Sequence, residues 1–286
     1  MTDYKSGDKV NQMKKVAMDT LQIVEKGSYL NSKGRWVNIK EECKLAIDDT
    51  EEYHPNELDK LLYDSSREIL PKTVITEVTE ETTQVVAYRL SREGVNDIAA
   101  LNFASAKNPG GGFIWGATAQ EEDVARCSAL YSCLEPMADF YRTNREARTV
   151  LYTDAIIYSP KVPFFRVTAK NKNDRIDDPF CASIITSPAP NLSSGDPSMK
   201  KPSLKVIIRR IGKILAVAED HGNRNLVLGA WGCGVFANDP EFVADVFGMW
   251  LENDRFKSSF DRVVFGVYDP SIDKKSYNAF KKRFCK

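Results

Sequence analysis

The sequence predicts an α/β protein of three layers, in which helices cover both faces of a central sheet. Helical patterns alternate with short apolar runs along the 286 residues, as in proteins whose strands are connected through helices. The apolar runs are continuous and do not alternate with polar residues, which indicates strands buried on both faces. No internal repeat is visible, so we expect residues 1–286 to form a single domain.

The composition argues against several classes of protein. Forty Lys and Arg balance forty Asp and Glu, so a basic face that coats nucleic acid is not expected. The N-terminus lacks an apolar signal region and no run reaches membrane-spanning length, which predicts a cytoplasmic protein (nuclear in a eukaryote) without membrane contact. Six scattered cysteines fit a reducing compartment. The sequence contains only two histidines, which are too few for a histidine-based metal site, and we expect neither a metal nor a cofactor.

Residues 1–72 are predicted to be a helical extension packed on the rest of the domain. Apolar residues recur at helical spacing over residues 8–25, and Gly27 follows as a stop. A short hairpin is expected at 29–37, and two further helices at 40–47 and 55–62. The acidic run at 48–52 is interpreted as a solvated surface.

The remaining elements alternate as an α/β fold requires. Strands are predicted over 74–78, 97–103, 151–158, 162–167, 182–186, 225–229 and 263–268. Helices are predicted over 80–93 with Thr79 as the cap, over 122–134 and on to about 142, and over 205–219, 240–251 and 274–284. Residues 169–179 and 190–202 are polar and are predicted to be loops.

A glycine-rich loop follows the predicted strand at 97–103. It reads NPGGG over residues 108–112. Glycine reaches left-handed backbone conformations and adds no bulk, and free N–H groups in such a loop can bind phosphate. We therefore expect the loop to hold a diphosphate, and a side chain placed at Gly111 to enter the space of that diphosphate.

Gln120, Glu121 and Glu122 follow the glycines after seven residues, at the start of a predicted helix. Taken alone, an acidic first turn is a common helix start that favours the helix dipole. Its spacing from the glycine loop favours a functional interpretation. Consecutive helical residues point about 100° apart, so we expect one glutamate to transfer a proton and the other to position the substrate.

A second glycine loop reads LGAWGCGVF over residues 228–236, between a predicted strand and a predicted helix. Ligands of α/β proteins bind at the carboxyl ends of strands, which favours a ligand-binding role. The alternative is that its glycines form a plain turn and that Phe236 belongs to the core.

Together the two loops and the QEE sequence resemble the signature of the microbial-type poly(ADP-ribose) glycohydrolases, and the resemblance covers nearly the whole chain. It implies a macrodomain-like fold with a mixed central sheet, and hydrolysis of ribose–ribose O-glycosidic bonds that releases ADP-ribose, mainly from chain ends. It also implies that Glu122 is the general acid that then activates water, while Glu121 and Gln120 hold ribose hydroxyls or orient Glu122. The implied substrate-binding residues are Asn102, Asn108, Gly110, Gly111, Gly112, Gln120, Gly232, Cys233, Gly234, Val235 and Phe236.

Two other functions stay open at this point. One is hydrolysis of ADP-ribose from another acceptor, such as a nucleic-acid base or a small metabolite. The other is a binding module that sequesters ADP-ribose without turnover, although a pure binder needs the glycine loops and not an acid. ADP-ribose, its polymer and ADP-ribosylated proteins are the expected partners, and a monomer is expected. One difficulty is that a helix N-terminus stabilises an ionised carboxylate, so burial and substrate phosphates would have to keep the acid protonated.

Overall fold

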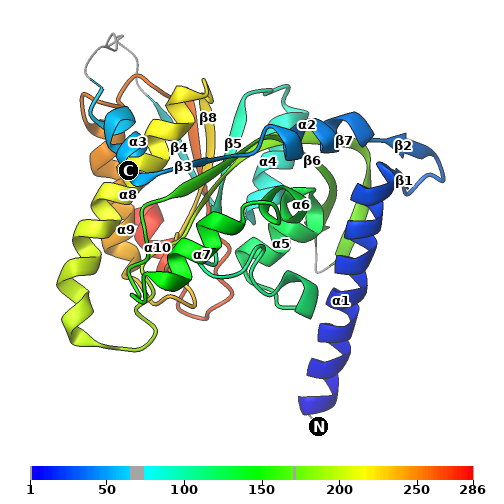
Figure 1. Ribbon diagram of the computed structural model, residues 1–286, viewed down its shortest axis with the longest axis horizontal. Helices are drawn as coiled ribbons and strands as arrows, with labels where there is room; N and C mark the ends of the chain where they lie inside the picture. Colours follow the sequence, from blue (N-terminus) through cyan, green and yellow to red (C-terminus); the bar gives the residue numbers. More distant parts are fainter. Residues whose placement is uncertain (1, 65–73, 170–171, 286) are drawn as a thin grey trace.

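The computed structural model describes residues 2–64, 74–169 and 172–285, and within them a seven-stranded sheet forms the centre. The strand order is β3-β6-β7-β5-β8-β9-β4 (Figure 1). Neighbouring strands from β7 to β4 are parallel, while β6 is antiparallel to both of its neighbours, so the sheet is mixed as predicted. The strands are β3 (Glu51–Tyr53), β4 (Ile75–Thr79), β5 (Ile98–Phe103), β6 (Ile156–Ala169), β7 (Lys172–Ser187), β8 (Asn225–Leu228) and β9 (Arg262–Gly266).

Helices cover both faces of the sheet, which confirms the predicted three layers (Figure 1). Along β5, Leu101 belongs to one core and Ala100 to the other, because alternate residues of a strand face opposite sides. One face carries α3 (Pro55–Leu62), α8 (Lys200–Asp220), α9 (Pro240–Glu252) and α10 (Lys275–Phe284). The other carries α1 (Thr2–Lys26), α2 (Lys40–Asp48), α4 (Thr83–Arg92), α5 (Gln120–Cys127), α6 (Leu130–Leu134) and α7 (Ala138–Glu146). The hairpin β1 (Ser28–Leu30) and β2 (Trp36–Asn38), and the short helices η1 (Phe113–Trp115) and η2 (Pro197–Met199), complete the described elements.

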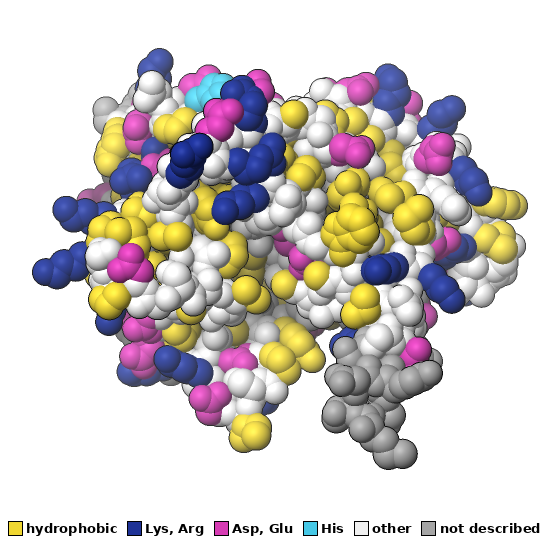
Figure 2. All heavy atoms as spheres, turned by 60° about the horizontal axis from the view of Figure 1, so that its bottom comes forward, with side chains coloured by type: hydrophobic (Ala, Val, Ile, Leu, Met, Phe, Trp, Pro, Cys, Tyr) yellow, Lys and Arg dark blue, Asp and Glu magenta, His cyan; other side chains and the backbone are white. Residues whose placement is uncertain are grey.

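The carboxyl ends of the parallel strands meet at one edge of the sheet. Phe103 at the end of β5 lies opposite Ser187 at the end of β7, and Leu228 at the end of β8 lies opposite Phe265 of β9. The loops that follow β5, β7 and β8 therefore emerge side by side. Figure 2 looks toward this part of the molecule and shows a hollow near the centre of the surface.

The acidic run at 48–52 is not simply a solvated surface, because part of it forms β3. Glu51 to Tyr53 pair in antiparallel register with Ile156 to Tyr158 of β6. An edge strand can carry charged side chains, which also prevent further strand pairing. The N-terminal extension is thus not wholly helical, and residues 65–72 of its predicted range lie outside the described residues.

The prediction of a loop over 169–179 is wrong for the described residues, because β6 extends to Ala169 and β7 begins at Lys172. Residues 170 and 171 of the predicted loop lie outside the described residues. The register pairs Arg166 with Arg175 and continues to Thr168 and Asn173. Asp19 of α1 forms ion pairs with both arginines. A contact distant in sequence therefore stabilises this charged hairpin, in addition to the buried Phe164 and Phe165 of β6.

Two predicted helix boundaries are also wrong. The helix expected over 122–134 starts at Gln120 and is interrupted at Ser128, whose backbone is extended and bridges to Phe164. The hydroxyl of Ser128 donates to the carbonyl of Val124, which ends the first helical segment. Thr79 ends β4 and does not cap a helix; α4 begins after Thr82 instead.

The N-terminal helix α1 packs against the elements that carry the first glycine loop. Ala17 of α1 forms a small core with Phe113 of η1 and Ala125 of α5. The hydroxyl of Thr20 donates to the carbonyl of Arg126 at 2.8 Å. Among the described residues, α1 and every other helix fall short of the length and apolar character needed to cross a membrane.

Candidate active site

Glu121 and Glu122 begin α5 beneath the loop that follows β5, and both side chains are buried, at 3% and 7% exposure. The Oε2 atom of Glu121 accepts the backbone N–H of Ser105 at 2.7 Å, and its Oε1 accepts Nδ2 of Asn102 at 3.2 Å. The Oε1 atom of Glu122 accepts the N–H of Gly112 at 2.8 Å, and its Oε2 accepts the N–H of Ala119 at 2.9 Å. Each carboxylate therefore fixes a different part of the loop.

The two carboxylates converge at Gly111, although they belong to consecutive residues. Gly111 has a left-handed φ of +59°, and a Cβ added there would lie 2.4 Å from Oε1 of Glu122 and 2.9 Å from Oε2 of Glu121. A side chain at Gly111 would therefore collide with both glutamates, a contact that the sequence did not predict, while its effect on the diphosphate stays a prediction. The left-handed φ directs the missing side chain inward, because the loop folds back over the start of α5.

The other two glycines of the first loop are required for different reasons. A Cβ at Gly110 would lie 2.9 Å from the ring of Tyr131, and one at Gly112 would lie 2.8 Å from Cβ of Ala117. Real Cβ atoms do not approach other atoms this closely, so the loop fits flat on α5 and α6 only without side chains. Asn108, which precedes these glycines, is exposed at the surface of the loop.

Burial raises the pKa of Glu121 to about 8, and the negative charge of Glu122 adds to this effect. The hydrogen bonds from Ser105 and Asn102 oppose the shift without cancelling it. Glu121 is consequently protonated at neutral pH. A carboxyl kept protonated in an apolar site can donate a hydrogen bond or a proton, which is common at catalytic sites.

Gln120 joins the start of α5 to the end of β5. Its Oε1 accepts the N–H of Phe103 at 2.8 Å, and its Nε2 donates to the carbonyl of Leu101 and to the hydroxyl of Thr83, both at 2.9 Å. Both amide hydrogens are thus used within the protein. These contacts favour the orienting role expected for Gln120 over direct contact with ribose.

The second loop follows β8 and is held against the segment that follows β7. Gly232 has a φ of +73°, and a Cβ there would lie 2.4 Å from Cβ of Ala189. The side-chain amide of Asn238 donates to the carbonyls of Pro190 at 2.8 Å and Gly232 at 2.9 Å. Asn238 lies two residues beyond the sequence motif, and no local pattern identified its role.

The predicted binding residues of the second loop differ in exposure. Val235 is 75% exposed, and Gly234 is also exposed, with open space where a Cβ would be. Cys233 is half-buried, and burial raises the pKa of its thiol well above the ordinary range. Phe236 is half-buried: it packs against the border of the core, and its ring centroid lies 6.2 Å from that of Tyr152.

The carbonyl of Ser187 connects the two loops. It accepts the N–H of Ala104 from the first loop at 3.3 Å and the indole N–H of buried Trp231 from the second loop at 2.9 Å. The predicted residues therefore fall into two hydrogen-bonded groups that share one anchor at the end of β7. In the described part of the chain, no three His, Cys, Asp or Glu side chains are grouped so that they could hold a metal ion.

The comparisons with known proteins agree with this geometry. The family model for the microbial-type PARG catalytic domain matches residues 17–167. The structure of poly(ADP-ribose) glycohydrolase from Thermomonospora curvata has a TM-score of 0.91 and 40% identity, covering 96% of this chain and all of the other. The same enzyme bound to the inhibitor ADP-HPD has a TM-score of 0.89 and 41% identity, with the same coverage. The Deinococcus radiodurans enzyme in complex with ADP-ribose has a TM-score of 0.79 and 40% identity, covering 86% of this chain and 98% of the other. Among curated proteins, none matches the chain.

The family match shows that this mixed α/β protein is a glycosidase. More specifically, the chain belongs to the microbial-type poly(ADP-ribose) glycohydrolase family, whose reaction is hydrolysis of the glycosidic bonds of poly(ADP-ribose).

The contact at Gly111 predicts that Gly111→Ala lowers activity by about 10²-fold, the scale of a lost acid–base group. The new methyl group would displace the Glu122 carboxylate from the N–H of Gly112. The matched control is Gly34→Ala, at a φ of +73° with open space around the added Cβ; it carries the same backbone strain without the collision. Hydrolysis of labelled polymer measures both variants, and equal activities would refute the steric role of Gly111.

The raised pKa of Glu121 predicts a pH-dependent stability difference between wild type and Glu121→Gln. A glutamate in the unfolded chain ionises at about pH 4.5, whereas Glu121 in the folded protein ionises at about pH 8. Between these two pH values the folded state binds one proton more than the unfolded state. Wild-type stability therefore falls with rising pH relative to Glu121→Gln across this window, and the difference levels off above it. Urea unfolding of both proteins from pH 5 to 9 measures the difference between their free energies of unfolding. If this difference does not change with pH, the pKa of Glu121 is not raised.

Proposed function

We propose that this chain releases ADP-ribose, mainly from the ends of poly(ADP-ribose), in a macrodomain-type site at the carboxyl edge of the sheet. The observation that carries the proposal is the pair of buried carboxylates that converge at Gly111, beside two glycine loops anchored on Ser187. Relatives in complex with ADP-ribose and with ADP-HPD support ADP-ribose as the ligand of this site.

Hydrolysis of a ribose–ribose bond needs a proton for the departing oxygen and stabilisation of an oxocarbenium-like ribose. We assign both proton transfers to Glu122. In this proposal the phosphates of the bound substrate keep the Glu122 carboxyl protonated. The carboxyl then protonates the leaving hydroxyl, and the resulting carboxylate takes a proton from the water that adds to the anomeric carbon. The two backbone N–H groups of Gly112 and Ala119 support this role by fixing the direction of the carboxylate.

Glu121 would act beside it as a substrate-positioning group. Because its carboxyl is neutral at pH 7, it can donate to one ribose hydroxyl and accept from another. The proton on Glu121 also supports the opposite assignment, in which Glu121 is the acid and Glu122 stabilises the positive charge on ribose. Matched glutamine variants distinguish the two assignments, as described below.

The diphosphate would be held by the loops through backbone groups. Free N–H groups in glycine turns bind phosphate without a net positive charge, which fits a chain whose formal charge is zero. The exposed Val235 and half-buried Phe236 lie on the second loop, where they could contact the diphosphate and ribose.

One experiment tests this function against its two alternatives. Labelled poly(ADP-ribose) and ADP-ribose attached to other acceptors are incubated with the protein, while calorimetry measures ADP-ribose binding. Release of ADP-ribose from the polymer supports the proposal. Release only from another acceptor would favour an ADP-ribosyl hydrolase, and binding without any release would favour a sequestering module.

The proposed acid predicts that Glu122→Gln lowers turnover by ~10²-fold or more while ADP-ribose affinity stays nearly unchanged. Glutamine keeps the size of the side chain and can still accept from one backbone N–H. In Glu121→Gln, affinity should change as well, because a positioning group contacts the bound substrate. Single-turnover assays and calorimetry provide the measurements, and near-normal turnover in Glu122→Gln would move the acid role to Glu121.

Catalysis by carboxylates and backbone groups predicts that turnover does not depend on a divalent metal. Activity should be unchanged after dialysis against EDTA. Loss of activity that Mg²⁺, Mn²⁺ or Zn²⁺ restores would contradict this mechanism.

A further inference from the structure

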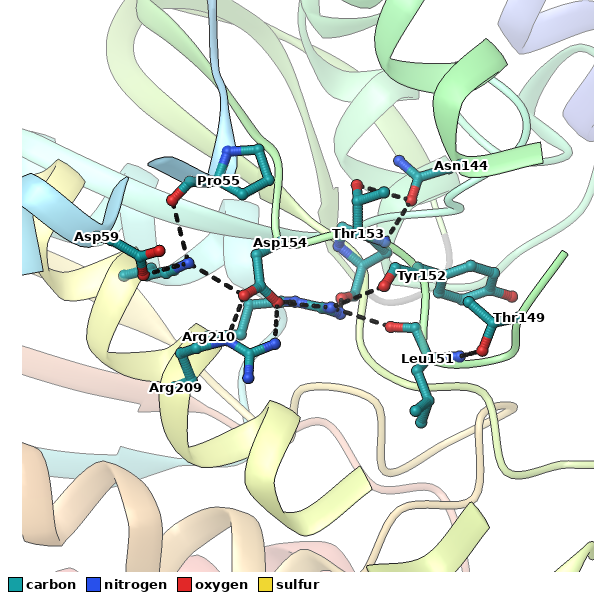
Figure 3. Close-up of polar contacts among 12 residues, drawn as sticks. Pro55, Asp59, Asn144, Thr149, Leu151, Tyr152, Thr153, Asp154, Arg209 and Arg210 are labelled. Atoms are coloured by element: carbon teal, nitrogen blue, oxygen red, sulfur yellow. Dashed lines mark hydrogen bonds and ion pairs between the residues drawn. The ribbon is translucent and has the colours of Figure 1, made fainter. Parts of the chain in front are cut away.

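A buried ion cluster centred on Asp154 joins the segment before β6 to helix α8 (Figure 3). Asp154, 7% exposed, precedes β6, and its carboxylate accepts from Arg209, Arg210 and Lys213 of α8. Burial alone would raise the pKa of Asp154, but the hydrogen bond from Arg209 and the charges of Arg210 and Lys213 hold it well below its usual range. Asp154 is therefore ionised, and its carboxylate binds three cationic side chains.

Arg210 also forms hydrogen bonds with backbone carbonyls outside the cluster. It is fully buried, and its Nη1 donates to the carbonyl of Pro188 at 2.6 Å while its Nη2 donates to the carbonyl of Leu151 at 2.9 Å. Both carbonyls lie in irregular segments, just after β7 and before β6. A buried carbonyl needs a hydrogen-bond donor, and the planar guanidinium supplies one to each segment at fixed geometry. Arg210 thereby ties two loop segments to the rigid helix α8.

The segment after β7 in turn supports the second glycine loop. The carbonyl of Pro190 accepts the side-chain amide of Asn238, which also binds the carbonyl of Gly232. The N–H of Leu192 donates to the carbonyl of Phe236 at 2.8 Å. A shift at Pro188 would therefore reach both ends of the second loop through direct contacts.

The segment before β6 supports the same loop from another side. The N–H of Asn191 donates to the carbonyl of Val150 at 2.8 Å, which joins the two segments. Tyr152 has a left-handed φ of +57°, and its ring lies against Phe236. A non-glycine residue keeps such a conformation only where its surroundings enforce it, and Arg210 binds the carbonyl of the preceding residue, Leu151.

We propose that Arg210 is a positioning residue for ADP-ribose binding, which acts through the segment Pro188–Asn191 to fix the second glycine loop. The inference rests on the proposed role of that loop in holding the diphosphate. Arg210 does not contact the glutamate pair in the described structure, because the first loop and β5 hold both carboxylates. Its loss should consequently weaken binding and leave the chemical step nearly unchanged.

Arg209 provides a matched control on the same helix. It binds the same Asp154 carboxylate, but among the described residues it donates to no backbone carbonyl. Arg210→Lys keeps a positive charge beside Asp154 and removes the forked contacts to Pro188 and Leu151. Arg209→Lys makes the same chemical change without touching either segment.

The test measures ADP-ribose affinity by calorimetry, and KM and kcat on poly(ADP-ribose), for wild type and both lysine variants. We expect Arg210→Lys to raise Kd and KM about tenfold and to change kcat by less than about twofold, whereas Arg209→Lys stays near wild type on all three. Unchanged Kd in Arg210→Lys, equal effects in the two variants, or a fall in kcat at constant Kd would each overturn the positioning role.

A second variant keeps the proposal testable if Arg210→Lys does not melt cooperatively. Asn238→Ala removes the bridge between Pro190 and Gly232 without disturbing a charge, and it should raise Kd and KM in the same way with kcat preserved. Wild-type affinity in Asn238→Ala would overturn the role. The wild-type control separates the two hypotheses: failure of the unaltered protein to bind ADP-ribose would reject the proposed function, whereas binding by wild type and variants alike would reject only the positioning role.

Discussion

The site depends on how closely the first glycine loop lies on the start of α5. Glu121 and Glu122 each accept backbone N–H groups from that loop, and both carboxylates approach Gly111 on the side where any other residue would have its Cβ. Loop and carboxylates therefore hold each other in place. This enclosure also removes Glu121 from water, which is the main reason that its pKa is raised to about 8. One packing constraint thus sets the geometry of the glutamate pair and the protonation of Glu121.

A second constraint joins the two loops, and it is a backbone contact. The carbonyl of Ser187 accepts from Ala104 and from the indole of Trp231, so the relative position of the loops is fixed by the end of β7. The segment that follows β7 is bound to the Asp154 cluster, because Arg210 donates both to the carbonyl of Pro188 and to Asp154. The formal charge of zero does not reveal this cluster, because its buried cations, Arg210 and Lys213, are paired with acids.

Local pattern was sufficient to predict the three layers and the approximate position of most strands and helices, because continuous apolar runs and helical periodicity depend on nearby residues. It also singled out Glu121 and Glu122, which lie buried together beneath the first glycine loop; their catalytic role stays a prediction. It failed where the deciding partner is distant in sequence: Asp19 stabilises the charged hairpin through Arg166 and Arg175, and β3 pairs with β6. The direction of the missing side chain at Gly111 depends on a backbone angle that composition does not specify. No local sequence pattern predicted the roles of Ser105, Asn238 and Arg210. Each of them forms hydrogen bonds with groups that only the folded chain brings near.

During synthesis, β5 must wait for both of the strands that flank it in the sheet. β5 carries the first loop, yet its two neighbours, β7 and β8, are synthesised later, up to Leu228. Asn102 meets Thr186 across 84 positions of the chain, and Ser187 meets Trp231 across 44. Contacts this far apart in sequence close slowly, and a chain emerging from the ribosome cannot form them until most of it has been made. The glutamates are thus translated well before β7 and β8, and a nascent chain leaves them exposed to water until synthesis has passed Leu228.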